Sequence, residues 1–139
     1  MPKLSSVLLV DDDPTNNFLN ERLLKRLAVT ENILVAENGL QALAVIQEAS
    51  ATAQPSYPAL ILLDIQMPVM NGIEFLQAYQ QLPPAQRSAT TVVVLSTSMN
   101  QHDLTRLEAL PAAGRITKPL TLEKLDAVLQ QHFQSPPSH

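Results

Sequence analysis

The chain contains no cysteine and no tryptophan, and aromatic residues make up only 4% of its 139 residues. Without cysteine, disulfide bonds, thiolate zinc sites and a cysteine nucleophile are all excluded. With so few aromatic side chains, a core must be built mainly from leucine, valine, isoleucine and alanine. Such a core favours a layered α/β arrangement or packed helices.

Charge is also sparse. Charged residues make up 16% of the chain, the formal net charge is −4, and the basic residues are scattered, which disfavours a nucleic-acid-binding surface. No apolar run approaches the ~20 residues that span a bilayer, and the N-terminal residues lack the long apolar stretch of a secretory signal. We therefore expect a cytoplasmic protein that binds neither membrane nor nucleic acid.

Hydrophobic residues, by contrast, make up 45% of the chain. This composition and the length predict one globular domain that can bury a core. We expect the domain to comprise residues 1–139, with an ordered core over about residues 5–133 and a frayed tail over 134–139.

Five short apolar runs along the chain are suited to strands. Three of them are continuously apolar, which is typical of parallel strands covered on both faces. The predicted strands are residues 7–10, 33–36, 60–63, 92–95 and 115–117.

Helical patterns lie between and after these strands. The first begins at Pro14, with Asp13 as its N-cap, and shows one apolar stripe. That stripe consists of Phe18, Leu19, Leu23, Leu24 and Leu27. Further patterns cover 40–46, 75–82, 104–110 and 122–129. The alternation predicts an α/β fold, a doubly wound five-stranded parallel sheet with right-handed crossovers.

Polar side chains follow four of the five strands. They are Asp11, Asp12 and Asp13, then Asp64, then Ser96, and finally Lys118. In open α/β sheets ligands bind beyond the carboxyl ends of the strands. Crowded carboxylates repel each other unless a cation lies among them, and oxygen ligands of this kind suit Mg²⁺.

Carboxylates, a divalent metal, a hydroxyl and an ammonium group at one point can stabilise a phosphoryl group during transfer. The residues therefore predict a phosphoryl-transfer site. Asp13 is not included in this site, because its role as the N-cap of the following helix is enough to account for an aspartate at that position.

Four stretches carry a specific resemblance. They are Val7–Val10 with Asp11 and Asp12, residues 62–72, residues 95–98 and residues 117–120. The most specific runs Asp64-x-x-Met67-Pro68-x-Met70-Asn71-Gly72. Together they resemble the receiver domain of two-component response regulators, over nearly the whole chain. The resemblance implies a flavodoxin-like receiver fold.

The resemblance also implies a role for each site residue. Asp64 would be the phosphoacceptor, with Ser96 and Lys118 contacting phosphoryl oxygens. The Mg²⁺ ligands would be Asp12 directly, Asp11 largely through water, Asp64 itself and the backbone carbonyl of Gln66. No enzymatic activity is implied beyond self-catalysed phosphorylation and dephosphorylation.

In function, the chain is similar to stand-alone, chemotaxis-type response regulators. Such a protein takes its phosphoryl group from a sensor histidine kinase or a histidine phosphotransfer protein. It signals to a partner protein, not named by the sequence, through residues 104–110, 115–117 and 122–133. The protein could act as a diffusible switch or as an intermediate in a phosphorelay. It could also form a homodimer. Candidates for the kinase contact are Asn16, Asn17, Asn20 and Glu21, although a solvated helix face describes them as well.

One position departs from the family pattern, because Arg115 stands where many receivers have tyrosine or phenylalanine. An arginine cannot bury its charged group in the same apolar pocket without a partner. We expect Arg115 to point outward, either toward an acidic partner or without consequence.

Two other readings compete with the receiver. Asp11-x-Asp13-x-Thr15 also fits the signature of haloacid-dehalogenase-type phosphatases, in which Asp11 would be the nucleophile and Asp13 the general acid. However, a chain of 139 residues leaves little room for the additional strand-and-turn elements and the cap that such phosphatases need. The second reading, a partner-binding module that has lost phosphorylation, conflicts with the complete set of site residues.

Overall fold

The computed structural model describes residues 4, 6–28, 30, 32–51, 58–65, 67, 69–83, 90–96, 105–106, 109–110, 114–118 and 120–133. Five strands form one parallel sheet in the order β2-β1-β3-β4-β5. The strands are β1 (Val7–Val10), β2 (Ile33–Ala36), β3 (Leu60–Asp64), β4 (Thr91–Ser96) and β5 (Gly114–Thr117). The helices are α1 (Pro14–Leu27), α2 (Gly39–Ala51), α3 (Gly72–Tyr79) and α6 (Leu122–Phe133).

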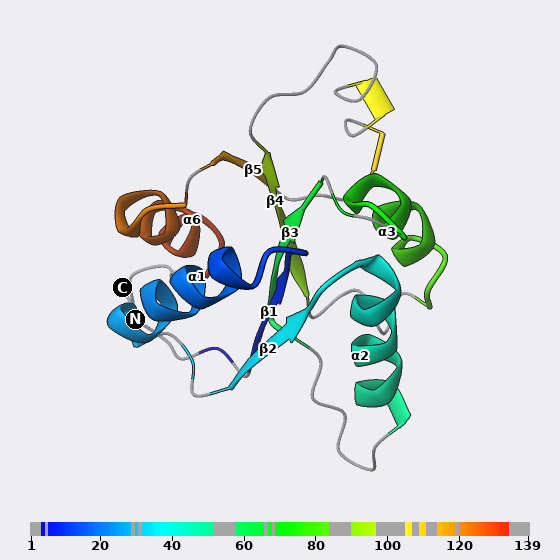
Figure 1. The fold of residues 1–139 in the computed structure, drawn as a ribbon, viewed down its shortest axis with the longest axis horizontal. Coiled ribbons are helices and arrows are strands. Elements are labelled where there is room, and N and C mark those ends of the chain that lie inside the picture. The colour runs from blue at the N-terminus through cyan, green and yellow to red at the C-terminus, as the bar shows by residue number, and fades with distance from the viewer. Residues whose placement is uncertain are drawn as a thin grey trace, which may run out of the picture.

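This architecture confirms the predicted doubly wound parallel sheet (Figure 1). β1 and β2 have the predicted bounds, and the other three strands are longer by one or two residues. β3 and β4 extend past their apolar runs because polar Asp64 and Ser96 still pair with the neighbouring strand. β4 and β5 also begin one residue earlier than predicted, at Thr91 and Gly114, which pair in the same way.

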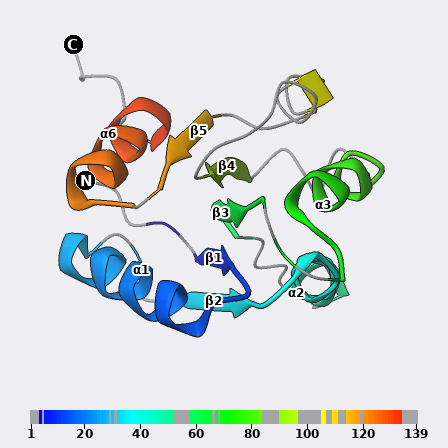
Figure 2. The ribbon, with the colours of Figure 1, turned by 45° about the horizontal axis from the view of Figure 1, so that its top comes forward.

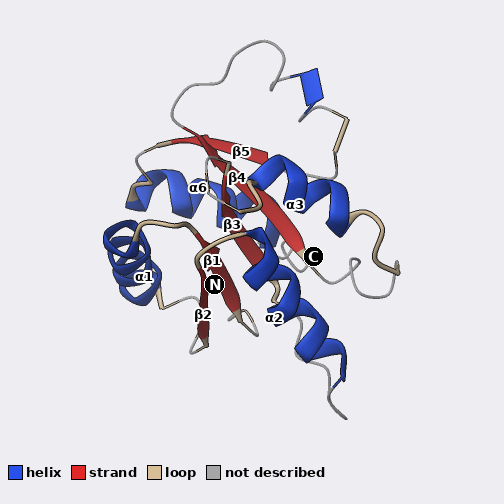
Figure 3. Ribbon diagram, turned by 45° about the vertical axis from the view of Figure 1, so that its right-hand side comes forward, coloured by secondary structure: helices blue, strands red, loops and turns tan. Residues whose placement is uncertain are grey.

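Helices cover both faces of the sheet. Figure 2 shows α1 and α6 on one face and α2 and α3 on the other, and Figure 3 shows the sheet between the two layers. Two hydrophobic clusters match these layers: Leu24, Leu125 and Leu129 pack on the α1/α6 face, and Ile46, Phe75 and other side chains on the α2/α3 face. The three central strands are buried on both sides, which explains their continuous apolar sequence.

Helix α1 begins as predicted, at Pro14 after the Asp13 cap, but its predicted apolar stripe is wrong in the first turns. Phe18 and Leu19 are 57% and 51% exposed. The buried face runs instead through Asn17, Asn20 and Leu24, spaced three and four residues apart. Leu23 and Leu27 pack at its margin.

Helix α3 begins with a capping box between Asn71 and Glu74 and ends at Tyr79. Leu82, which the pattern placed on this helix, lies in the following turn, where its N–H donates to the Tyr79 carbonyl at 3.0 Å. Of the helix predicted at 104–110, the structure describes residues 105–106, which are helical, and residues 109–110, which form a turn. The tail at 134–139 lies outside the described residues. Among the helices that are described, none has the length and apolarity to cross a membrane.

Candidate functional site: an acidic cluster with one lysine

The sheet order sets where a site can form. From β1 the chain moves outward to β2 and then returns to the other side of β1 to form β3. The crossovers on either side of this switch diverge, which leaves a crevice beyond the carboxyl ends of β1 and β3. Asp11 follows β1 directly, and Asp64 is the last residue of β3.

Three carboxylates meet at this crevice. Asp11, Asp12 and Asp64 each offer an oxygen, and these oxygens all lie within 4.8 Å of one another. Asp11 and Asp64 are buried, at 2% and 4% exposure, whereas Asp12 is exposed. Burying two carboxylates this close together is costly unless positive charge compensates them.

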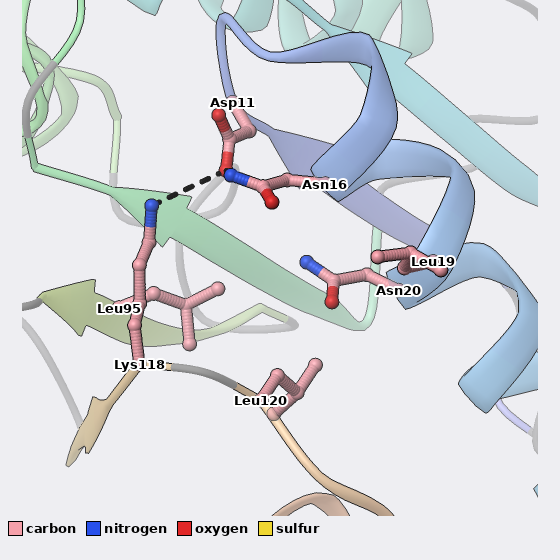
Figure 4. A pocket seen from close by; sticks show the side chains of 7 residues that line it. All are labelled: Asp11, Asn16, Leu19, Asn20, Leu95, Lys118 and Leu120. Atoms are coloured by element: carbon pink, nitrogen blue, oxygen red, sulfur yellow. Dashed lines mark hydrogen bonds and ion pairs between the residues drawn. The ribbon is translucent and has the colours of Figure 1, made fainter.

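Lys118, which follows β5, supplies part of that charge. Its Nζ lies 3.0 Å from Oδ1 of Asp64 and 3.4 Å from Oδ2 of Asp11, and Figure 4 shows the ammonium directed toward Asp11. Burial lowers the pKa of Lys118. The hydrogen bonds to Asp64 and Asp11 and the charges of both carboxylates outweigh this, so the pKa is raised above 10.5. Lys118 therefore stays charged between the two carboxylates.

Ser96 lies at the carboxyl end of β4 and is 8% exposed. Its carbonyl accepts a hydrogen bond from the Lys118 N–H at 2.7 Å, so Ser96 and Lys118 are held side by side. The structure thus brings Asp11, Asp12, Asp64 and Lys118 into one cluster, with Ser96 on the same edge. Gln66, predicted to offer its carbonyl, lies outside the described residues.

Two asparagines hold Asp11 in a way that the sequence analysis missed. Asn17 Nδ2 donates to the Asp11 carbonyl at 2.9 Å, and Asn16 Nδ2 lies 3.3 Å from Asp11 Oδ2. Asn17 is only 5% exposed, and so is Asn20 at 9%, although Asn20 is not one of the two that hold Asp11. The interpretation of Asn17 and Asn20 as part of a solvated helix face was therefore wrong. The available signal was position, because side chains of a first helical turn point back toward the preceding loop.

A pocket of about 80 Å³ opens beside the cluster. Figure 4 shows its walls, with Asn16, Leu19 and Asn20 from α1 facing Leu95, Lys118 and Leu120. Asp11 lies at one end of it. The pocket lies between α1 and the polar edge of the sheet.

Gly72 lies close against the end of β3. The Gly72 N–H donates to the Ile65 carbonyl at 2.9 Å, and a Cβ at position 72 would lie 2.6 Å from the Asp64 carbonyl oxygen. Only glycine permits this approach. Val69, between Asp64 and Gly72, has φ of 67°, which is strained for a β-branched residue.

Asp13 behaves as the predicted helix cap. Its carboxylate accepts the Thr15 N–H at 2.8 Å, so the two residues that would complete a phosphatase signature with Asp11 are engaged with each other. Arg115 is exposed on β5, as expected from its charge.

The donor set fits a divalent cation. Three carboxylates and one ammonium carry a formal charge of minus two, and hard oxygen ligands at one point are what Mg²⁺ prefers. Asp11, Asp12 and Asp64 are the residues that would hold it.

The chain is also similar to known proteins. The sequence model of the response regulator receiver domain matches residues 7–130. The response regulator Rcp1 of Synechocystis is 32% identical over 124 residues, which are 89% of this chain and 83% of Rcp1. The autoinducer 1 sensor kinase/phosphatase LuxN of Vibrio campbellii is 36% identical over 124 residues, 89% of this chain but only 13% of LuxN.

Among solved structures, a two-component response regulator from Cytophaga hutchinsonii superposes with a TM-score of 0.80 at 31% identity, over 93% of this chain and 96% of that one. Since the family model matches most of the chain and the fold agrees, the chain belongs to the response regulator receiver domain family.

Proposed function

We propose that this domain accepts a phosphoryl group on Asp64 from a phosphorylated histidine of a sensor histidine kinase or a histidine phosphotransfer protein. The observation that carries the proposal is the buried Asp64 carboxylate, 3.0 Å from the Lys118 ammonium, at the edge where two more carboxylates converge. Membership of the receiver family supports the same role.

In the proposed reaction, a carboxylate oxygen of Asp64 attacks phosphorus, and a P–O bond forms as the N–P bond of the phosphohistidine breaks. The electron pair of the broken bond stays on the imidazole nitrogen, which takes up a proton from water. The product is an acyl phosphate. Attack of water on its phosphorus releases inorganic phosphate and restores the carboxylate, and we propose no other enzymatic activity.

The chain's own residues stabilise the added charge. Lys118 already contacts Asp64, so its ammonium can pair with a phosphoryl oxygen there, and the Ser96 hydroxyl can donate to another. Bound Mg²⁺, held by Asp11, Asp12, Asp64 and the Gln66 carbonyl, would supply positive charge that lowers the cost of the crowded phosphoryl oxygens.

Phosphorylation would change what Ser96 and Lys118 contact. Ser96 is the last residue of β4, and Lys118 directly follows β5. We therefore propose that β5, α6 and residues 104–110 form the surface that binds a downstream protein, by a shift between two arrangements. Exposed Arg115 would favour an acidic partner there. We propose that this single receiver domain acts in the cytoplasm, as a monomer or as a homodimer.

The test is intact mass after incubation with acetyl phosphate and Mg²⁺. We expect wild type to gain one labile phosphoryl group, only with Mg²⁺, and Asp64→Asn to gain none. Asp13→Asn is the matched control, since asparagine also caps helices, and it should be phosphorylated like wild type.

Steady phosphate release that depends on Asp11 and Asp13 but not Asp64 would contradict the proposal and favour a phosphatase. Absence of both adduct and turnover would contradict it too and favour a partner-binding module.

A further inference from the structure

The peptide unit that joins Thr117 to Lys118 is held at both of its polar atoms. Its N–H, from Lys118, donates to the Ser96 carbonyl at 2.7 Å. Its carbonyl, from Thr117, accepts a hydrogen bond from Nζ of Lys124 at 2.8 Å. One holding group therefore comes from β4 and the other from α6.

Helix stability does not explain a lysine at position 124. Lys124 lies in the first turn of α6, where its N–H lies 3.2 Å from the Thr121 hydroxyl. A cation at this end of a helix opposes the helix dipole and costs free energy. Side chains of a first turn point back past the helix start, which is how the ammonium reaches the end of β5.

We propose that Lys124 is a positioning residue for Lys118. By fixing the Thr117–Lys118 peptide unit, its ammonium fixes the direction in which the Lys118 side chain leaves β5 toward Asp64 and Asp11. The same hydrogen bond connects Lys118 to the first turn of α6, part of the proposed partner surface. Only the expected effect of Lys124 on phosphorylation rests on the proposed function, whereas the positioning of Lys118 does not.

The first experiment uses the unphosphorylated protein and amide hydrogen exchange measured by NMR. Lys124→Met keeps the length of the side chain but removes the ammonium, Lys124→Arg keeps a cation, and Lys25→Met is the control. Lys25 is an exposed lysine on α1 that pairs only at the surface with Glu21 among the contacts described for it.

We expect exchange of the Lys118 N–H to accelerate about three- to tenfold in Lys124→Met, a change in keeping with the loss of one exposed hydrogen bond, which contributes less than a buried bond to a charged group. It should stay at the wild-type rate in Lys25→Met and return toward it in Lys124→Arg. The Leu129 amide in α6 should be unaffected. Unchanged Lys118 exchange, or acceleration along the whole of α6, would overturn the inference.

The second measurement is the rate of phosphorylation by acetyl phosphate. We expect Lys124→Met to slow transfer about fivefold with unchanged half-saturation, and Lys124→Arg to restore it. A wild-type rate in Lys124→Met would overturn the positioning role. If wild type itself gained no phosphoryl group, the proposed function would fail, while the exchange experiment would still decide whether Lys124 holds the peptide unit.

Discussion

The central strands and their carboxyl ends are both buried but differ in chemistry. Every residue of β1, and residues 60–63 and 92–95 of β3 and β4, is apolar and at most 2% exposed. The next residues along these strands are Asp11, Asp64 and Ser96, none more than 8% exposed. The apolar runs contribute stability in proportion to the area that they bury, whereas buried carboxylates cost free energy unless paired.

This difference shows how the molecule divides its work. The strands determine where each polar side chain lies. The reactive side chains themselves are buried polar groups, which lower the stability of the fold unless they are paired. The cost at Asp11 is reduced by the Asp13 N–H at 2.9 Å, by Asn16 and by Lys118. Variants in each region should therefore separate stability from phosphorylation.

The largest effect on stability should come from the strand interior. Leu62 of β3 is 1% exposed within the α1/α6 cluster, so Leu62→Ala should lower the free energy of unfolding by about 3 kcal/mol. Urea unfolding measures this, with Leu40→Ala, at a position that is 52% exposed, as a control that should cost far less. Loss of phosphorylation in Leu62→Ala under conditions where the protein is still folded would show that the strand interior contributes to reactivity as well as to stability.

A smaller effect should follow at the strand ends. Lys118→Met leaves Asp11 and Asp64 without their shared cation, and should lower the free energy of unfolding by about 2 kcal/mol in metal-free buffer. Because the ammonium no longer competes for these oxygens, added Mg²⁺ should raise the melting temperature more in Lys118→Met than in wild type. Equal shifts in the two proteins would show that Lys118 and the metal use separate groups.

The smallest effect should come from the segment that follows Asp64. Val69 is 74% exposed and has φ of 67°, so little packing is lost and strain is relieved when it is replaced by glycine. We expect Val69→Gly to raise the free energy of unfolding by about 0.5–1 kcal/mol, since the strain removed exceeds the added entropy of the unfolded chain. Thermal unfolding measures this, and a lower melting temperature would show that Val69 carries no such strain.

Much of the fold was predictable because parallel strands in a covered sheet leave a clear apolar pattern. The same logic predicted that Asp11, Asp64, Ser96 and Lys118 share one edge, since strand ends of a parallel sheet meet there. The family resemblance was needed to assign them roles.

The buried face of a helix could not be predicted where polar side chains take part in it. On α1 the apolar Phe18 and Leu19 are exposed while Asn17 is buried, because Asn17 bonds to the Asp11 carbonyl. Periodicity cannot reveal a polar group that is buried to hold a neighbour. Lys124 was missed for a similar reason, because a lysine in a first helical turn resembles any surface lysine until its contact with Thr117 is known.

The most direct test of the account is to locate the phosphoryl group. Borohydride reduces an acyl phosphate to an alcohol, so the modified aspartate becomes homoserine and can be found by peptide mass mapping. We expect homoserine at position 64 alone, and only after incubation with Mg²⁺ and acetyl phosphate. Homoserine at position 11 or 12, or none in a protein that has gained the mass of a phosphoryl group, would contradict the account.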